Sequence, residues 1–462
     1  MTPDEFRKAG HQLIDWIADY RSHVADFNVM AQTAPGEIRA RLPASPPDTP
    51  ESFDAILDDL EKIILPGLSH WQSPNFFGYF PSNGLLASVL GDYASTGLGV
   101  LGLSWQSSPA LTELEEVTTD WMRQMVALSD AWSGVIQDTA STCSLLALIC
   151  AREKGGQVVY VSAHSHSSVN KAASLAGFKQ VHVVEHDEEF AMSAVALEAR
   201  IQRDLAAGLK PCAVVATTGT TASTALDPIE AIALIAKKYG IWLHVDAAMA
   251  GSAMILPECR WMWKGVEDAD SVVLNPHKWL GIAFDCSLYY VRDPQHLIRV
   301  MSTNPSYLQS SADTEVKNLR DWGIPLGRRF RALKIWFAVR EQGISGLQQR
   351  LRRDLENAQW FAEQVRAAEN WWVLAPVHLQ TICIRHQPPG LEGEDLDRHT
   401  QGWADRVNRS GRAYLTPAIL DGRWMVRVSI GAILTEREHV EALWALIQRE
   451  VAQVPDVPDL RL

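Results

Sequence analysis

The sequence predicts an α/β protein in which a mainly parallel sheet is covered by helices on both faces. From about residue 110, short apolar and β-branched runs alternate with helical stretches along the chain. These runs are continuously apolar, as expected of strands that are buried on both faces of a parallel sheet. We expect this large domain at residues 86–350, after a helical arm at residues 1–85 and before a small α+β domain at residues 351–462.

The N-terminal arm begins with apolar side chains at three- and four-residue spacing over residues 3–25, which predicts an amphipathic helix. A proline-rich stretch from Pro35 to Pro50 follows, and we expect it to be extended rather than regular. A helix on such an arm has no core of its own nearby. We therefore expect it to pack on another part of the protein or on a second subunit.

The later elements follow from the same patterns. Strands are predicted at Val158–Val161, Val181–Val184, Ala213–Ala216, Ile241–Val245, Val272–Leu274 and Leu288–Val291. Helices are predicted at Leu145–Arg152, Ala194–Ala207 and Ile229–Tyr239. The C-terminal region carries helical periodicity through Gln364, then strands at Thr381–Arg385 and Trp424–Ile430, and a final helix around His439–Gln453.

Composition narrows the class of protein. The chain has 462 residues, of which 47% are hydrophobic and 21% charged, which excludes a largely disordered chain. A net charge of −13 argues against a nucleic-acid binder, which needs a basic face. The six cysteines form no CxxC pair, and the N-terminus has no signal-peptide pattern. No apolar run is long enough to span a membrane, so we expect a cytoplasmic protein.

Lys278 is the residue that most suggests chemistry. It lies in a loop just past the predicted strand Val272–Leu274, where open α/β sheets bind their ligands. Its neighbours Pro276, His277 and Trp279 can shield it from water, and desolvation makes an amine nucleophilic toward an aldehyde. An isolated lysine in a turn is more often a surface residue, so this interpretation depends on the residues around it.

Asp246 ends another predicted strand, and the small residues Ala247, Ala248, Ala250 and Gly251 surround the position where something flat could approach. A carboxylate facing a pyridine nitrogen keeps it protonated, so that pyridoxal 5'-phosphate (PLP) can act as an electron sink. An N-cap for the next turn is the alternative role for this Asp. An Asp and a Lys at strand ends in one crevice favour the cofactor interpretation.

Donors for a phosphate are also present. Ser141 or Thr142 would lie at the N-terminus of the predicted helix Leu145–Arg152, where free N–H groups and the helix dipole favour anions. Simple capping explains these residues equally well. The segment Thr217–Thr221 follows a buried strand and adds hydroxyl groups in the same crevice.

His164 and His166 follow the strand Val158–Val161, and either ring could stack on a pyridine. Spacing alone does not choose between them. The His-x-His pair could also suggest a metal, but no third ligand at a metal-like spacing supports it, and we expect no metal site.

With the motifs Asn275–Trp279 and His244–Ala248 in hand, the chain resembles the group II PLP-dependent decarboxylases, and within them the aromatic L-amino acid decarboxylases. The resemblance runs from about residue 4 to residue 450. Further segments that carry it are Phe76–Pro81, Ser104–Pro109, Thr112–Glu115, Thr218–Thr221, Ile324–Arg331 and Val426–Ser429. It implies a PLP-dependent transferase fold of type I and a homodimer, with the N-terminal arm packed on the partner subunit.

Carried over residue by residue, the resemblance makes Lys278 the Schiff-base lysine, Asp246 the pyridine partner, His166 the stacking histidine and Tyr307 the tyrosine of a catalytic loop. It thereby chooses His166 over His164. With these, the implied cofactor contacts are Ala140, Ser141, Thr221, Ala248, Asn275 and His277. The implied substrate side comprises His166, Trp71, Tyr79, Phe80, Pro81, Ser82, Leu101 and Leu103.

The resemblance implies decarboxylation of an aromatic L-amino acid to its amine and CO2. The alternatives are an aromatic aldehyde synthase, which also deaminates oxidatively, and a decarboxylase of a non-aromatic amino acid. In aldehyde-forming relatives the tyrosine is typically Phe or the stacking histidine is Asn, whereas this chain keeps Tyr307 and His166. Two departures remain. Asp138 stands where the phosphate loop often has Gly, and the loop after Tyr307 is slightly shorter than in animal relatives.

Overall fold

The computed structural model describes residues 1–303 and 315–452, so Tyr307 and Gln453 lie outside the described residues. By its internal contacts the chain divides into two compact units. Unit 1 comprises Met1–Pro81, Trp360–Trp372 and Ile384–Leu462, and unit 2 comprises Ser82–Gln359 and Val373–Cys383. The domain boundaries expected at residues 85 and 350 stay predictions.

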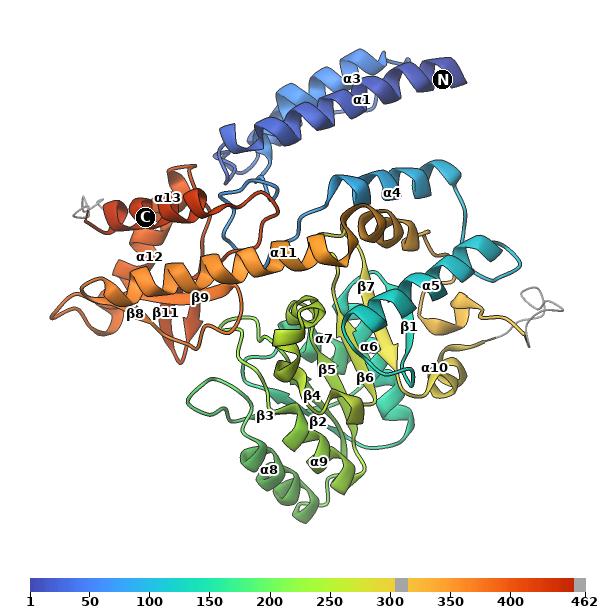
Figure 1. The fold of residues 1–462 in the computed structure, drawn as a ribbon, viewed down its shortest axis with the longest axis vertical. Coiled ribbons are helices and arrows are strands. Elements are labelled where there is room, and N and C mark those ends of the chain that lie inside the picture. The colour runs from blue at the N-terminus through green and yellow to red at the C-terminus, as the bar shows by residue number, and fades with distance from the viewer. Residues whose placement is uncertain (304–314, 453–462) are drawn as a thin grey trace. The chain divides into compact units, whose positions relative to one another are not determined.

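Unit 2 contains a seven-stranded sheet in the order β1-β7-β6-β5-β4-β2-β3 (Figure 1). Its strands are β1 (Ser133–Gln137), β2 (Val158–Ser162), β3 (Gln180–Val184), β4 (Pro211–Thr217), β5 (Trp242–Asp246), β6 (Ser271–Leu274) and β7 (Ser287–Val291). The pairs from β3 to β6 are parallel, whereas β7 is antiparallel to both β6 and β1. The prediction of a mainly parallel sheet is confirmed. The strand β1 was not predicted.

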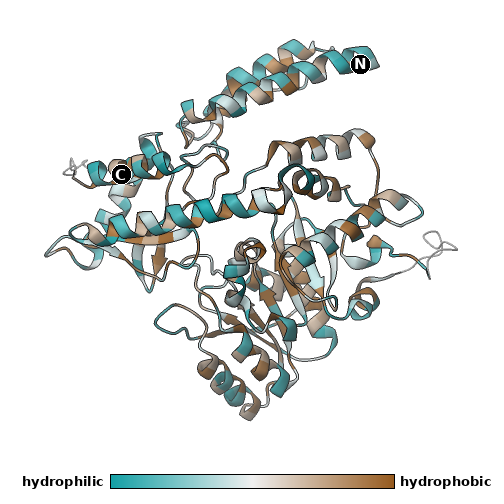
Figure 2. Cartoon of the chain, viewed as in Figure 1, coloured by the Kyte–Doolittle hydropathy of each residue, from teal (hydrophilic) through white to brown (hydrophobic). Residues whose placement is uncertain are grey.

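Helices cover this sheet. α6 (Ala140–Glu153) packs on β1, β4, β5, β6 and β7, while α8 (Ala194–Ala206) and α9 (Ile229–Tyr239) contact each other and pack on strands β3 to β5. Figure 2 shows hydrophobic residues along the strands and a mixture of both kinds along α11 (Ala332–Ala367). Unit 2 also contains the α-helices α4 (Leu86–Leu98), α5 (Pro109–Met125), α7 (Ser167–Leu175) and α10 (Pro294–Met301).

Unit 1 begins with α1 (Pro3–His23), whose first turn is closed by a capping box between Thr2 and Glu5. Ala9 is its one buried residue, and Phe6 and Ile14 are exposed. The prediction that the proline-rich stretch is extended was wrong for α2 (Glu37–Arg41). This helix fits between Pro35 and Pro43, starting after Gly36, whose φ of +89° turns the chain.

The other elements of unit 1 are α3 (Phe53–Asp59), α12 (Gly393–Arg409), α13 (Arg437–Ala452), β10 (Thr416–Leu420) and β11 (Arg423–Ser429). A second sheet has the order β10-β11-β9-β8, with β8 at Trp371–Val373 and β9 at Thr381–His386. The helix α12 packs on β10, β11 and α13. Among the described residues, no helix combines the length and apolarity needed to cross a bilayer.

Candidate active site

The residues expected to contact the cofactor follow strands that end at one edge of the unit 2 sheet. Because β1 is antiparallel to β7, and β7 is antiparallel to β6, β1 runs in the same direction as the parallel strands. The carboxyl ends of β1, β2, β4, β5 and β6 therefore meet at the same edge. In open α/β sheets this edge is where ligands bind.

Asp246 is the last residue of β5 and is 4% exposed. Its Oδ1 accepts a hydrogen bond from Ala248 N at 3.0 Å, and its backbone carbonyl accepts one from Thr218 N at 2.9 Å. Asp246 thus also caps the turn that follows it, which was the alternative role for this side chain. Gly251 serves packing, because a Cβ there would lie 2.5 Å from Leu274 Cβ.

Lys278 lies in the turn after β6, and its backbone N–H donates to Asn275 O at 2.9 Å. Two backbone bonds join this loop and its strand to the segment after Asp246, from Ala247 N to Val273 O and from Asn275 N to Ala248 O, each 2.9 Å long. The fold therefore holds the backbone that carries the amine beside the backbone that carries the acid.

Both neighbours of Lys278 are buried and bonded. Burial lowers the pKa of His277 to about 4, so its ring is neutral and its Nδ1 accepts from Cys286 N at 2.9 Å. The indole of Trp279, 0% exposed, donates to Asp354 Oδ2 at 2.9 Å. The backbone on each side of Lys278 is consequently fixed, whereas Lys278 itself is only half-buried.

His166 and His164 lie in different surroundings. His166 caps α7, with its Nδ1 accepting from Ser168 N at 3.2 Å. Burial lowers the pKa of His166, the charge of Lys278 lowers it further, and the charge of Asp246 opposes the shift. The ring of His164 packs instead on His186 and Phe190.

The turn after β1 offers an anion site at the start of α6. Thr139 is the N-cap but its side chain makes no capping hydrogen bond. In the described part of the chain, the N–H groups of Ala140 and Ser141 have no protein acceptor. Such groups suit a phosphate.

Other polar groups near this edge also fit a bound cofactor. The hydroxyl groups of Thr217 and Thr218 are buried and have no hydrogen-bond partner among the residues that are described. Thr217 lies directly opposite Asp246 in the sheet. Asn275 is buried, and its Oδ1 accepts from Ser287 Oγ at 2.6 Å. Thr221 is half-buried at the end of the same threonine-rich segment.

The residues expected on the substrate side fall in both units. In unit 1, Trp71 stacks on Tyr79 with ring centroids 5.4 Å apart, and Tyr414 donates from its hydroxyl to Tyr79 at 3.3 Å. The guanidinium of Arg427 lies 4.7 Å from the Phe80 ring centroid, and Pro81 is the last residue of the first segment of this unit. Tyr414 was missed, because it lies far along the chain from Tyr79 and no motif marks it.

In unit 2, Ser82 Oγ donates to His277 O at 3.2 Å, which attaches this residue directly to the loop of Lys278. Leu101 is 61% exposed and Leu103 is half-buried.

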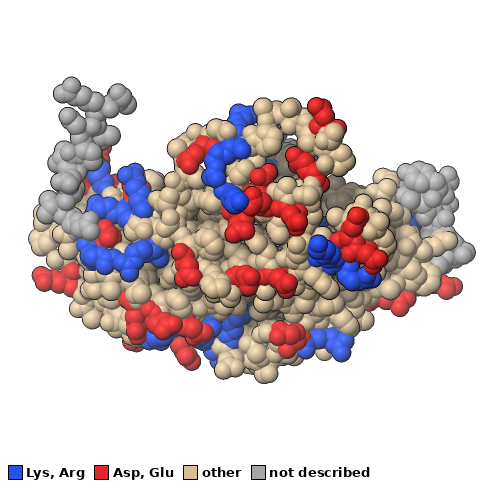
Figure 3. Space-filling model, turned by 90° about the horizontal axis from the view of Figure 1, so that it is seen from above, with Lys and Arg blue, Asp and Glu red and all other residues tan. Residues whose placement is uncertain are grey.

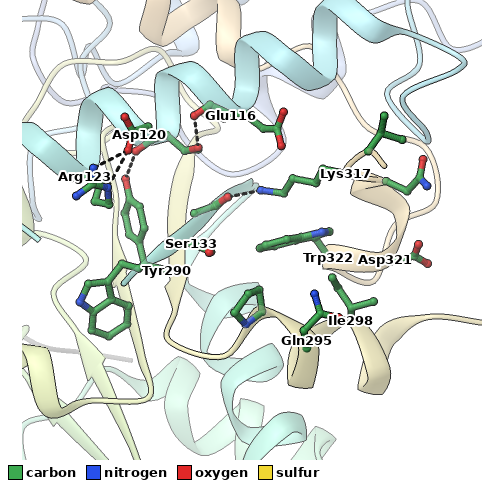
Figure 4. Close-up of a pocket in the computed structure, with 16 residues that line it drawn as sticks. Glu116, Asp120, Arg123, Ser133, Tyr290, Gln295, Ile298, Lys317, Asp321 and Trp322 are labelled. Carbon is green, nitrogen blue, oxygen red and sulfur yellow. Dashed lines mark hydrogen bonds and ion pairs between the residues drawn. The ribbon is translucent and has the colours of Figure 1, made fainter. Parts of the chain in front are cut away.

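A cavity of about 640 Å³ lies elsewhere in unit 2, at the beginning of β1, and none of the predicted site residues lines it. Figure 4 shows Lys317 and Trp322 facing each other in it, with Lys317 Nζ 3.6 Å from the ring centroid. Burial lowers the pKa of Lys317 to about 8, and its amine donates to Gly134 O at 2.6 Å. This cavity is at the opposite end of β1 from Asp138 and is separate from the candidate active site.

A lysine and an acid at adjoining strand ends, beside an uncapped helix N-terminus, fit the family that the sequence matches over residues 35–387, described as the pyridoxal-dependent decarboxylase conserved domain. The chain belongs to this family and is a pyridoxal-dependent decarboxylase. The predicted fold and cofactor are thereby confirmed.

Its relatives narrow the class. The chain is 41% identical to tyrosine decarboxylase 4 of Petroselinum crispum, over 97% of this chain and 93% of that protein. It is 40% identical to phenylacetaldehyde synthase of Arabidopsis thaliana, over 98% of this chain and 97% of that one. The crystal structure of Oryza sativa TDC with PLP and tryptamine superposes with a TM-score of 0.95 at 35% identity, covering 98% of each chain.

Proposed function

We propose that this protein decarboxylates an aromatic L-amino acid, releasing the corresponding amine and CO2. The observation that supports the proposal is that Lys278, Asp246 and His166 lie at or just after the carboxyl ends of β6, β5 and β2, at one sheet edge, in a chain similar to a tyrosine decarboxylase over nearly its whole length. PLP bound there supplies an electron sink for the electron pair that remains when CO2 leaves.

The chain's own residues would act as follows. Lys278 holds the cofactor, and the carboxylate of Asp246 faces its ring nitrogen. Ala140 and Ser141 give their N–H groups to the phosphate, with Asn275 and Thr221 beside them. Ala248 and His277 belong to the same cofactor set. Partial burial and the charge of Lys278 lower the pKa of His166, which favours a neutral ring beside an aromatic ring.

On the substrate side, we assign the aromatic wall to Trp71, Tyr79, Phe80, Pro81, Leu101 and Leu103. Ser82 supplies a hydroxyl that is already bonded to the lysine loop. Tyr307 would deliver a proton to the α-carbon of the substrate.

Release of amine and CO2 from a panel of L-amino acids tests the proposal. The panel includes tryptophan, tyrosine, Dopa, phenylalanine and histidine, of which at least one is expected to be decarboxylated, and glutamate should be refused. Lys278→Ala should lose both turnover and the PLP absorbance band. Retained turnover in this variant would refute the role of Lys278, and exclusive use of an acidic substrate would refute the aromatic class.

An aldehyde synthase is the second candidate, because the chain is 40% identical to phenylacetaldehyde synthase. The same assay separates the two, since an aldehyde synthase releases ammonia and peroxide in place of the amine.

We further propose a homodimer with the N-terminal arm on the partner subunit. Apolar side chains on α4, namely Leu86, Leu90, Tyr93 and Leu98, are between 43% and 63% exposed in the single chain, and such a surface favours a partner. Sedimentation at graded concentrations measures this, and a monomer at all of them would contradict it.

A cytoplasmic location is supported by the cysteines, all six of which are free and buried, as in proteins of reducing compartments. Cell fractionation tests this location. Charged side chains of both signs are interspersed over the face in Figure 3, in line with a protein that does not bind nucleic acid.

A further inference from the structure

The carboxylate of Asp138 lies at the N-terminus of α6, the helix end to which the proposed function assigns the cofactor phosphate. Asp138 follows directly after β1, and its Oδ1 accepts a hydrogen bond from Thr139 N at 2.6 Å. Its backbone carbonyl accepts from Ser287 Oγ at 3.3 Å, and the same hydroxyl donates to Asn275 Oδ1. Asp138 is therefore linked through Ser287 to Asn275, one of the proposed cofactor contacts.

Asp138 has no ion-pair partner among the described residues, although its negative charge is one of the smaller causes that raise the pKa of the Arg331 guanidinium. Across residues 1–303 and 315–452, no lysine, arginine or histidine forms a salt bridge with Asp138. Arg331 is bound instead to both carboxylate oxygens of Asp285, at 3.0 and 3.1 Å.

The position of the charge relative to α6 follows from the hydrogen bond to Thr139 N, since Thr139 is the N-cap of that helix. Cys143 lies in the first turns of α6. Burial is the main cause that raises the pKa of its thiol, and the negative charges of Asp138 and Asp246 raise it further, in line with this geometry.

We propose that Asp138 weakens binding of the cofactor's phosphate group. This enzyme would then hold PLP less tightly, and exchange it more readily, than it would with an uncharged residue at position 138. The inference rests on the proposed function, which places the phosphate on Ala140 and Ser141. Thr139 N, which the carboxylate occupies, is one residue from Ala140 N. The carboxylate of Asp138 and the phosphate would then share one helix N-terminus. The favourable interaction with the helix dipole would be divided between these two anions.

The size of the effect follows from Coulomb's law. Two like charges that share one helix N-terminus, in the partly solvated environment of a half-buried side chain, repel by an amount that corresponds to roughly a tenfold change in Kd. Salt screens part of this repulsion, so the effect should shrink at high ionic strength.

Binding of PLP and of pyridoxal, which lacks the phosphate, to cofactor-free full-length protein tests the proposal. The variant Asp138→Asn keeps an oxygen that can accept from Thr139 N but removes the charge. We expect it to lower the Kd for PLP about tenfold and to slow PLP loss on dialysis, while the Kd for pyridoxal stays unchanged. Asp130→Asn, an exposed change of the same kind in the loop before β1, is the matched control and should bind both compounds as the wild type does.

Several outcomes would overturn the inference. Equal PLP affinity of Asp138→Asn and the wild type would show that the charge does not act on the phosphate. Equal shifts for PLP and pyridoxal would place the effect on the ring or on folding. Tighter PLP binding by Asp138→Gly alone would make competition for Thr139 N the cause, not charge. A wild-type chain that binds no PLP at all would instead refute the proposed function.

Discussion

Lys278 lies between two side chains that the fold fixes on either side of it. His277 is held by the backbone of Cys286, and Trp279 is held by the carboxylate of Asp354 on α11. His277 and Trp279 are buried, whereas Lys278 between them is half-buried. Its backbone is fixed, and its amine is carried by a flexible aliphatic side chain. That is a suitable arrangement for a lysine that must release its cofactor to an incoming amine and recover it afterwards.

Tyr307, which lies outside the described residues, is the residue expected to protonate the α-carbon of the substrate. We predict that Tyr307→Phe lowers amine formation about 100-fold, because a phenylalanine cannot deliver the proton that completes the amine. In its place oxygen is reduced to peroxide while the amine carbon is oxidised, which releases aldehyde and ammonia. Coupled assays for peroxide and ammonia measure this change.

Tyr239 at the end of α9, whose hydroxyl donates to Glu198 Oε1 at 3.1 Å, provides the control, since Tyr239→Phe should leave the products unchanged. An unaltered ratio of amine to aldehyde in Tyr307→Phe would rule out the proton-delivery role.

Single residues were predictable where a strand end marked them. Lys278, Asp246 and the threonines after β4 each follow a continuous apolar run, and the structure brings these strand ends together. The choice between His164 and His166 could not come from spacing, because both follow β2 within four residues of its end. Asp354 and Tyr414 were missed because their partners, Trp279 and Tyr79, are remote in sequence.

Among the elements, β1 shows why a strand can escape detection. Its sequence contains only two branched apolar residues, Val135 and Ile136, and a glycine that looks unfavourable in a strand. The structure explains the glycine, since a Cβ on Gly134 would lie 2.6 Å from Tyr290 Cε1 on the neighbouring β7. The antiparallel direction of β7 likewise depends on the short connection from β6, which contains no helix to return the chain.

One buried carboxyl group joins three segments beside the candidate site. Asp227, 1% exposed, accepts from Met192 N and from Thr217 N, both at 2.7 Å, and so ties the end of β4 to the segment before α8. Burial raises its pKa to about 7, against the effect of these two hydrogen bonds. The folded protein therefore keeps this proton at pH values where the unfolded chain has lost it.

The sign of the resulting pH dependence follows. A carboxyl whose pKa rises on folding stabilises the fold most below its unfolded pKa of about 3.9, and that contribution is lost as the pH rises to about 7. We predict that Asp227 alone makes the free energy of unfolding about 2–3 kcal/mol larger at pH 5 than at pH 8. Denaturant unfolding of cofactor-free protein at both pH values measures the difference.

Asp227→Asn should remove this part of the pH dependence, whereas Glu188→Gln, an exposed change nearby, should keep it. If Asp227→Asn and the wild type lose the same free energy between pH 5 and pH 8, the carboxyl group is not the cause.

At the scale of the whole molecule, the fold class and the C-terminal elements were predictable from sequence. Strands and helices that are buried in a core carry a regular local spacing of apolar residues. The division into units was less accessible to sequence. Unit 1 combines Met1–Pro81 with two later segments, and nothing in the local pattern signals that residues so far apart join one core. The apolar side chains on α1 and α4 that are exposed in the single chain are the surface that the proposed homodimer would cover.

The account depends most on Lys278 as the residue that holds the cofactor. Borohydride reduction of the PLP-loaded enzyme fixes the cofactor to whichever lysine holds it, and mass spectrometry of the digested protein identifies that residue. We predict one pyridoxyl group per chain, on the peptide that contains Lys278. A pyridoxyl group on any other lysine, or none on a chain that still decarboxylates its substrate, would contradict the account.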